Sequence, residues 1–151
     1  MRIIIDDLSG QAIADFLEAH IQDMRTVSPP QSKHALDLEG LRQPDITFWS
    51  VYREDRLVAC GALKELDPRH GELKSMRVAS EARGQGVASR LLAHILHTAR
   101  ARGYERVSLE TGATAFFQPA VALYRKYGFL PCPPFGEYRE DPNSLFMSLA
   151  L

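Results

Sequence analysis

The sequence lacks any hydrophobic run long enough to cross a membrane. Its longest apolar stretch is Leu57 to Leu63, whereas a membrane-spanning helix needs about 20 residues. The N-terminal isoleucines run directly into two aspartates, which a signal peptide would not do. Only two cysteines occur, Cys60 and Cys132, and they do not make a disulfide framework. We therefore expect a reducing, cytoplasmic location.

The sequence also lacks an excess of charge of either sign. It has 18 lysines and arginines against 19 aspartates and glutamates, a formal net charge of −1. This balance gives no reason to expect nucleic acid or an anionic membrane as a partner. Metal-binding patterns are absent too, because only His94 and His97 lie close together and no HExxH motif or cysteine–histidine cluster occurs. We expect no metal.

The composition is that of a soluble globular protein, with 45% hydrophobic and 25% charged residues in a chain of 151. No repeat, low-complexity tract or linker divides it. We expect a single domain over residues 1–151.

Hydrophobic periodicity predicts strands that pair first through hairpins and later connect through helices. The expected strands are Arg2–Asp6, Ile46–Arg53, Arg56–Leu66, Glu72–Val78, Arg106–Glu110, one from Phe129, and Leu145–Leu149. The expected helices run from Ser9 to Thr26, around Leu38–Leu41, from Gly86 to Gly103 and from Pro119 to Tyr127. This order indicates an α/β fold with a mixed sheet flanked by helices.

The most informative motif is the glycine-rich segment Arg83–Ala88, which lies between the strand Glu72–Val78 and a long amphipathic helix. A glycine turn that opens a helix presents unpaired backbone N–H groups at the positive end of the helix dipole. Such a turn binds anions, phosphates above all. Gly84 and Gly86 allow a tight turn, and Arg83 can form paired hydrogen bonds to phosphate oxygens.

The same six residues resemble the acetyl-CoA signature of the GCN5-related N-acetyltransferase (GNAT) family, with Arg83, Gly86 and Ala88 in the motif positions. A second segment, Ala122 to Phe129, resembles the family's later helix-to-strand segment, which reads Ala, Leu, Tyr and then Gly-Phe. The resemblance covers roughly Val51 to Leu130.

The resemblance implies a mostly antiparallel sheet of six to seven strands and about four helices, with strands four and five splayed apart. It implies an enzyme that transfers an acetyl group from acetyl-CoA to a primary amine by direct attack in a ternary complex. The cofactor contacts that it implies lie at the end of the fourth strand, in the glycine loop and near the later helix: Met76, Val78, Arg83, Gly84, Gln85, Gly86, Val87, Ala88, Phe117 and Tyr124. Phe117 stands where many members have an asparagine.

Tyr124 is the candidate general acid, because it matches the family tyrosine near the coenzyme A sulfur and a phenol stays protonated at neutral pH. Glu72 is the candidate base, since some members have a glutamate six residues before the valine of the fourth strand. Glu110, at the end of the fifth strand, is the competing base, and it could instead hold a cationic amine.

Lys74 alternates onto the Glu72 face of a regular strand, whereas Arg77 points to the other face unless a bulge intervenes. Either cation could bind a substrate carboxylate, but exposed and unpaired strand charges are the favoured interpretation.

Two polar loops outside the shared core are expected to contact the acceptor, Ser28–Asp37 and Phe135–Ser144. Within them His34, Tyr138 and Asn143 are the candidate substrate residues. A small-molecule amine is the favoured acceptor, and a protein N-terminus, a lysine or a non-catalytic acyl-CoA-binding module are the alternatives. The resemblance also admits a homodimer.

Overall fold

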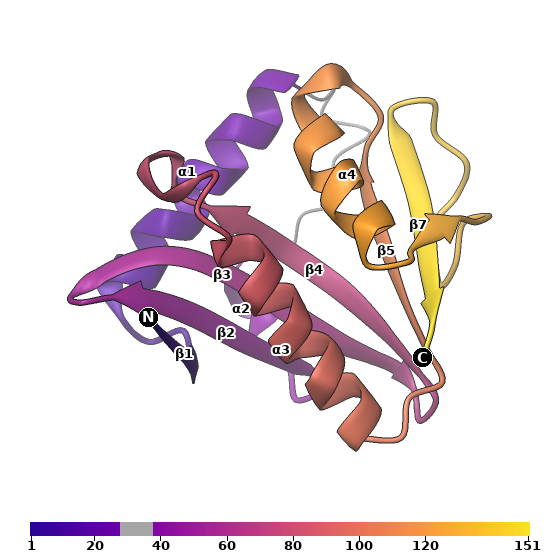
Figure 1. The fold of residues 1–151 in the computed structure, drawn as a ribbon, viewed down its shortest axis with the longest axis horizontal. Coiled ribbons are helices and arrows are strands. Elements are labelled where there is room, and N and C mark those ends of the chain that lie inside the picture. Colours follow the sequence, from indigo (N-terminus) through magenta and orange to yellow (C-terminus); the bar gives the residue numbers. More distant parts are fainter. Residues whose placement is uncertain (28–37) are drawn as a thin grey trace.

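The computed structural model describes residues 1–27 and 38–151, which form one sheet with helices on both faces (Figure 1). The strands are β1 (Arg2–Ile5), β2 (Ile46–Arg53), β3 (Arg56–Asp67), β4 (His70–Val78), β5 (Arg106–Gly112), β6 (Leu130–Pro131) and β7 (Ser144–Ala150). The helices are α1 (Gln11–Val27), α2 (Leu38–Leu41), α3 (Val87–Ala101) and α4 (Gln118–Lys126), with 3-10 turns η2 (Ser80–Ala82) and η3 (Ala115–Phe117). This arrangement confirms the expected mixed α/β fold.

The sheet has the strand order β1-β2-β3-β4-β5-β7-β6. Every neighbouring pair is antiparallel except β4 and β5, which run parallel. Parallel neighbours need a crossover connection, and α3 supplies it. The predicted hairpin between β2 and β3 turns at Glu54, whose φ is 55°.

Two hydrophobic cores cover the two faces of the sheet. On one face α3 buries Leu91, Leu92, Ile95 and Leu96 against the sheet. Each of these side chains is at most 2% exposed, and full burial of one such side chain contributes about 1.5–3 kcal/mol. The opposite face is covered by α1 and α2, whose buried residues Ile13, Leu17 and Leu41 pack with Phe48 and Cys60.

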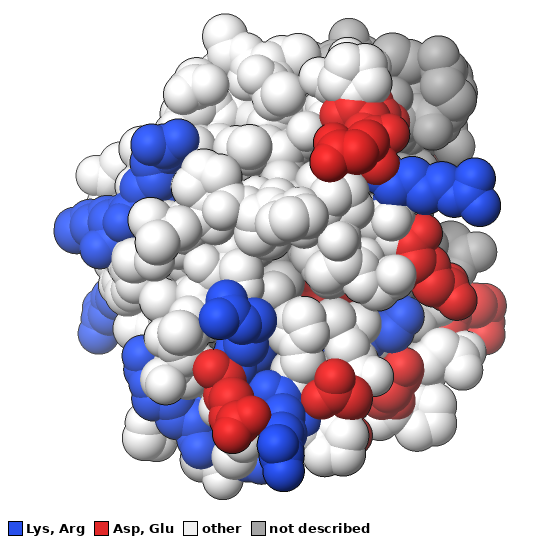
Figure 2. Space-filling view, turned by 90° about the vertical axis from the view of Figure 1, so that its right-hand side faces the viewer, with Lys and Arg blue, Asp and Glu red and all other residues white. Residues whose placement is uncertain are grey.

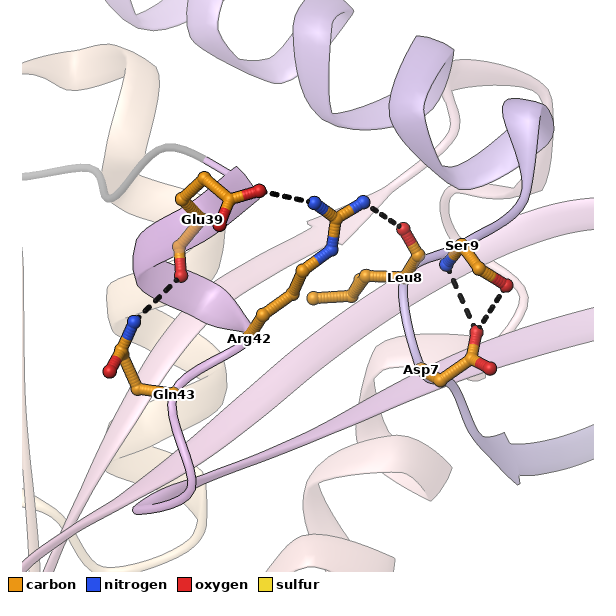
Figure 3. Close-up of polar contacts among 6 residues, drawn as sticks. All are labelled: Asp7, Leu8, Ser9, Glu39, Arg42 and Gln43. Carbon is orange, nitrogen blue, oxygen red and sulfur yellow. Dashed lines mark hydrogen bonds and ion pairs between the residues drawn. The ribbon is translucent and has the colours of Figure 1, made fainter.

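The connection between β1 and α1 is fastened to α2 by one arginine (Figure 3). Arg42 donates from Nη1 to Glu39 Oε1 at 2.5 Å and from Nη2 to the Leu8 carbonyl at 2.7 Å. Asp7 accepts hydrogen bonds from the backbone N–H and the hydroxyl of Ser9. These contacts fix the start of α1, so they also determine where its later residues lie over the sheet.

A bulge in β4 changes which face its later residues occupy. Between Cys60 and Ala62 the strand β3 advances two residues while its partner β4 advances three, from Lys74 to Arg77. Ser75 lies within this bulge and has a positive φ of 57°. A positive φ is common at a bulge residue.

The bulge decides the side on which Arg77 lies, which the sequence left open. Arg77 reaches Asp23 of α1 with Nη1 at 2.6 Å, so it lies on the α1 side, as Glu72 and Lys74 do. Met76 turns instead toward α3, where its sulfur packs over Gly61.

The strand expected from Phe129 is only Leu130–Pro131 in the structure. Phe129 itself is fully buried beside Tyr124. Proline has no backbone N–H to donate to a sheet, and Pro131, Pro133 and Pro134 therefore limit this strand to the edge.

Candidate active site in the splay between two parallel strands

The parallel pairing of β4 and β5 ends at Leu73 and Leu109. Beyond that point residues 74–78 and 110–112 diverge, and Figure 1 shows the two strands opening into a V. A cavity of about 110 Å³ lies in this opening. The splay expected between the fourth and fifth strands is thus present.

Side chains from five parts of the chain line the cavity. They come from α1, β4, β5, the η3–α4 segment and the loop between β6 and β7. The polar and aromatic ones are His20, Glu72, Lys74, Ser75, Glu110, Thr111, Phe117, Tyr124 and Tyr138. The structure therefore brings together the candidate acid, both candidate bases and one candidate substrate residue.

Glu72 is held in a compact polar cluster with Lys74 and Tyr138. Lys74 Nζ lies 2.9 Å from Glu72 Oε2, and the Tyr138 hydroxyl donates to the same oxygen at 2.6 Å. Lys74 Nζ also donates to the Tyr138 oxygen at 3.0 Å. The side chains of Glu72 and Lys74 are only 4% and 9% exposed.

Lys74 and Arg77 are therefore neither exposed nor unpaired, and that expectation was wrong. Arg77, with 13% of its side chain exposed, pairs with Asp23 and lies over the ring of Phe16. Lys74 lies on the α1 side through regular alternation with Glu72, and the bulge at Ser75 brings Arg77 to the same side.

Tyr138 reaches Glu72 because its loop is anchored by aromatic packing. Its ring lies 5.2 Å from that of Phe135 and 5.6 Å from that of Phe146 on β7. Burial, followed by the nearby Glu72 charge and the hydrogen bond to it, raises the pKa of Tyr138 well above its usual 10. The phenol thus stays protonated and acts as a donor.

Tyr124 lines the cavity from α4 and is 6% exposed. Burial raises the pKa of Tyr124 above its usual 10. Its ring packs at 5.7 Å from that of Phe129. Tyr124 therefore keeps its proton at neutral pH, which a general acid requires.

Glu110 and Phe117 complete the β5 side of the cavity. Glu110 directly follows the last residue of β5 that pairs with β4, and its charge contributes to the raised pKa of Tyr138. Phe117 is 9% exposed and lies directly over Gly112, where a Cβ atom would come within 2.0 Å of the ring. An aromatic surface thus occupies the position of the family asparagine.

The glycine loop follows β4 and leads into α3, as the sequence predicts. Gly84 and Gly86 have φ of 74° and 79°, and Gly86 is the N-cap of α3. The first N–H groups of a helix have no acceptor within it. The space around both glycines is open, since a Cβ atom would meet nothing within 4 Å. Such a turn fits a pyrophosphate group that approaches the backbone closely.

The side chains at the rim of this loop make local contacts. Arg83 Nε donates to the Val78 carbonyl at 3.4 Å, and Gln85 Nε2 donates to the Glu81 carbonyl at 3.1 Å. Both residues are exposed.

Two candidate substrate residues are not placed in the cavity. His34 lies outside the described residues. Asn143 contributes to the turn before β7, where its N–H donates to Asp141 Oδ1 at 2.9 Å and its carbonyl accepts from Ala113 N–H at 3.0 Å. The structure adds His20 of α1, which was not among the candidate site residues.

The described part of the chain shows neither a metal centre nor a membrane-spanning helix. No group of three or more His, Cys, Asp or Glu side chains suited to a metal occurs in residues 1–27 and 38–151. No helix among the described residues is long and apolar enough to cross a membrane. On the face shown in Figure 2, basic and acidic side chains both appear, and neither sign forms a continuous field.

The sequence model of the acetyltransferase (GNAT) family matches residues 13–129. The chain belongs to this family. The match includes both motifs and the two strands that form the splay, so the GNAT fold accounts for the cavity and the glycine loop together.

Close relatives include N-acetyltransferases from several bacteria. YsnE of Bacillus subtilis (strain 168), named an uncharacterized N-acetyltransferase, is 54% identical over 151 residues, 100% of each chain. An IAA acetyltransferase from Azospirillum brasilense is 40% identical over 141 residues, 93% of this chain and 91% of the relative.

Solved GNAT structures have the same fold. A proposed acyl-CoA N-acyltransferase from Klebsiella pneumoniae superposes with a TM-score of 0.81 at 25% identity, covering 99% of this chain and 97% of the other. A GNAT family acetyltransferase from Elizabethkingia anophelis with acetyl-CoA bound superposes with a TM-score of 0.66 at 17% identity, again covering 99% and 97%. The protein is an acetyl-CoA-dependent N-acetyltransferase.

Proposed function

We propose that this GNAT enzyme acetylates the primary amine of a small molecule, by direct attack in a ternary complex. The observation that carries the proposal is the polar cavity in the splay. It measures about 110 Å³, and Tyr138, from the β6–β7 loop, contributes to its wall. A cavity of this size suits a small acceptor better than a protein segment.

The cofactor would be held along the end of β4 and the start of α3. The N–H groups of Gly84 to Ala88 would bind its pyrophosphate, with Arg83 at the rim. Met76, Val78 and Phe117 would contact the pantetheine arm, and Met76 and Phe117 line the cavity. Acetyl-CoA, when bound, supplies the thioester whose acetyl group is transferred. The N–H group of Val78 is the donor for the developing oxyanion.

Glu72 is the base that we favour, because of how its two oxygens differ. Lys74 and Tyr138 both contact Oε2. Glu72 also lines the cavity, so its other oxygen, Oε1, is the one that would take the proton of an entering amine. Glu110 of β5, which lines the same cavity, is the competing base.

In this proposal the amine nitrogen forms the new amide bond as the C–S bond breaks, and Tyr124 is the donor that would protonate the departing coenzyme A thiolate. Tyr124 lines the same cavity from α4, and its raised pKa keeps the phenol protonated over the range in which the enzyme would work. The proposed base and acid thus line one small cavity, where each could reach the reacting groups.

A thiol-release assay with acetyl-CoA tests the proposal. The acceptor panel should contain small amines, amino acids, short peptides with free N-termini or lysines, and IAA, because one relative is named an IAA acetyltransferase. We expect release with one class of small amine. Release only with peptides would favour a protein acceptor, and coenzyme A binding without release from any acceptor would contradict the proposal.

Variants in the same assay test the residues. Glu72→Gln should lower kcat by about 10²–10⁴-fold, the usual contribution of a general base. Tyr124→Phe should lower kcat without a comparable change in the KM for acetyl-CoA. Glu65→Gln is the matched control, because Glu65 also accepts a tyrosine hydroxyl but does not line the cavity. Full activity of Glu72→Gln together with inactivity of Glu110→Gln would transfer the base role to Glu110.

A further inference from the structure

We infer that Tyr138 is a positioning residue that holds the carboxylate of Glu72 with Oε1 directed at the acceptor amine. The inference rests on the proposed function, in which Glu72 is the base. It assigns to the β6–β7 loop a part in catalysis that is separate from forming a wall for the substrate.

The geometry carries this role. The Tyr138 hydroxyl donates to Glu72 Oε2 at 2.6 Å and accepts from Lys74 Nζ at 3.0 Å, while Lys74 Nζ also lies 2.9 Å from Oε2. The three groups close a triangle that fully engages one oxygen of the carboxylate. Rotation of the carboxylate would break two charge-assisted contacts at once, so the carboxylate keeps its orientation and Oε1 is left for the acceptor amine.

The loop is built to hold the hydroxyl in this place. Tyr138 sits in a cluster with Phe135 and Phe146, and Phe135 also lies against His70 at 6.0 Å. The backbone N–H of Tyr138 donates to the Phe135 carbonyl at 3.0 Å. A tyrosine ring packed between two aromatic neighbours has little freedom, so its hydroxyl is a preorganised donor rather than a mobile one.

Tyr138→Phe removes one of the two donors to the carboxylate. A hydrogen bond donated to a carboxylate favours its charged form. The other titratable groups that line the cavity with Glu72 are Lys74 of β4, Glu110 of β5, His20 of α1 and Tyr124 of α4. His70 of β4 lies outside the cavity but interacts electrostatically with Glu72. These groups stay in place in a Tyr138→Phe variant, which keeps the ring and loses only the oxygen.

The test is the pH dependence of kcat and kcat/KM for Tyr138→Phe with the acceptor identified in the thiol-release assay. We expect kcat to fall about tenfold, the effect of losing one hydrogen bond to a charged group. The acidic limb of the pH profile should move about one unit toward higher pH. The KM for acetyl-CoA should not change.

Tyr104→Phe is the matched control. Its hydroxyl donates to Glu65 Oε1 at 2.8 Å, so the same tyrosine–carboxylate bond is removed outside the cavity. This variant should keep the kcat and the pH profile of the wild type, and melting temperatures of both variants show whether folding is affected.

The outcomes separate the inference from the proposed function. If Glu72→Gln is inactive and Tyr138→Phe keeps the wild-type pH profile and kcat, the positioning role is overturned while Glu72 remains the base. If Tyr138→Phe changes only the KM for the amine, Tyr138 touches the substrate instead and the inference is wrong. If Glu72→Gln is as active as the wild type, the base assignment itself fails.

Discussion

Three glycines around the site are required for two different physical reasons. Gly84 and Gly86 have positive φ values and open surroundings, so the backbone conformation demands glycine there. Gly112 has no such φ, but the ring of Phe117 occupies the place where its Cβ atom would be. The sequence identified the first pair through their motif and gave no sign of the third.

Gly112→Ala should destabilise the protein and disturb the cavity together. The added Cβ atom would come within 2.0 Å of the Phe117 ring, so the ring must move into the cavity that it lines. Overpacking of this kind costs about 1–3 kcal/mol of unfolding free energy. Chemical denaturation measures the loss, and the KM for acetyl-CoA should rise. Gly10→Ala, with nothing within 4 Å of the new atom, is the control and should change neither.

The residues at the site differ in how far the sequence could predict them. The motifs indicated Glu72 and Tyr124, and both line the cavity. The partner of Glu72 could not be inferred in the same way, because Tyr138 lies 66 residues away in a loop. Aromatic packing on Phe135 and Phe146 places the Tyr138 hydroxyl beside Glu72. Hydrophobic periodicity in the sequence does not predict packing of this kind.

At the scale of elements, the two helices that carry the motifs are joined by one tyrosine. Tyr127, at the end of α4, donates from its hydroxyl to the Ser89 carbonyl at 2.9 Å, and the Ser89 hydroxyl lies 2.5 Å from the same oxygen. Ser89 belongs to the first turn of α3, directly after the glycine loop. This contact links the helix of Tyr124 to the proposed pyrophosphate site.

Tyr127→Phe should weaken cofactor binding more than catalysis. Without the hydroxyl the first turn of α3 loses its connection to α4, and the N–H groups of the glycine loop are less well fixed. The loss of one or two neutral hydrogen bonds corresponds to about a threefold to tenfold rise in the KM for acetyl-CoA. Steady-state kinetics at saturating amine measure it. Tyr52→Phe on β2 is the control and should keep the wild-type KM. If Tyr127→Phe instead lowered kcat threefold to tenfold and left the KM for acetyl-CoA unchanged, this role would be contradicted.

Elements with a strong local pattern were predicted well, and elements determined by distant contacts were not. The periodicity of α3 and the hairpin of β2 and β3 are local features, and both are confirmed. The bulge at Ser75 depends on how β3 pairs with β4, so the sequence left the side of Arg77 open. The prolines explain why β6 is short. The sequence did not predict this length, because it does not reveal that β6 lies at the edge of the sheet.

On the scale of the whole molecule, the sheet consists of two antiparallel halves that meet only along the paired part of β4 and β5, from His70 to Leu73. A buried polar chain spans this junction. His70 Nε2 lies 2.7 Å from the Ser108 hydroxyl on β5, which lies 3.0 Å from the Ser148 hydroxyl on β7. Arg106, the first residue of β5, donates from Nη1 to the same Ser148 hydroxyl at 2.7 Å. The chain connects the two halves at the end away from the splay.

This junction should make the stability of the protein depend on pH through His70. Burial lowers the pKa of His70 below its usual 6.5 in the folded protein, and the nearby Arg106 charge lowers it further. The charges of Asp67 and Glu72 act in the opposite direction but do not cancel this effect. The unfolded chain therefore takes up the proton at a higher pH than the folded protein does. The stability that this difference contributes is fully present above about pH 6.5 and is lost as the pH falls toward the lowered folded-state pKa.

Denaturant unfolding between pH 7.5 and pH 5 measures this effect. The wild type should lose unfolding free energy over that interval, and His70→Gln should show a smaller slope, because a neutral amide keeps a polar contact to Ser108 but does not titrate. His97→Gln, on the exposed side of α3, should keep the wild-type slope. Equal slopes in the wild type and His70→Gln would mean that the junction between the two halves does not sense pH, and that any acid sensitivity comes from carboxylates elsewhere in the molecule.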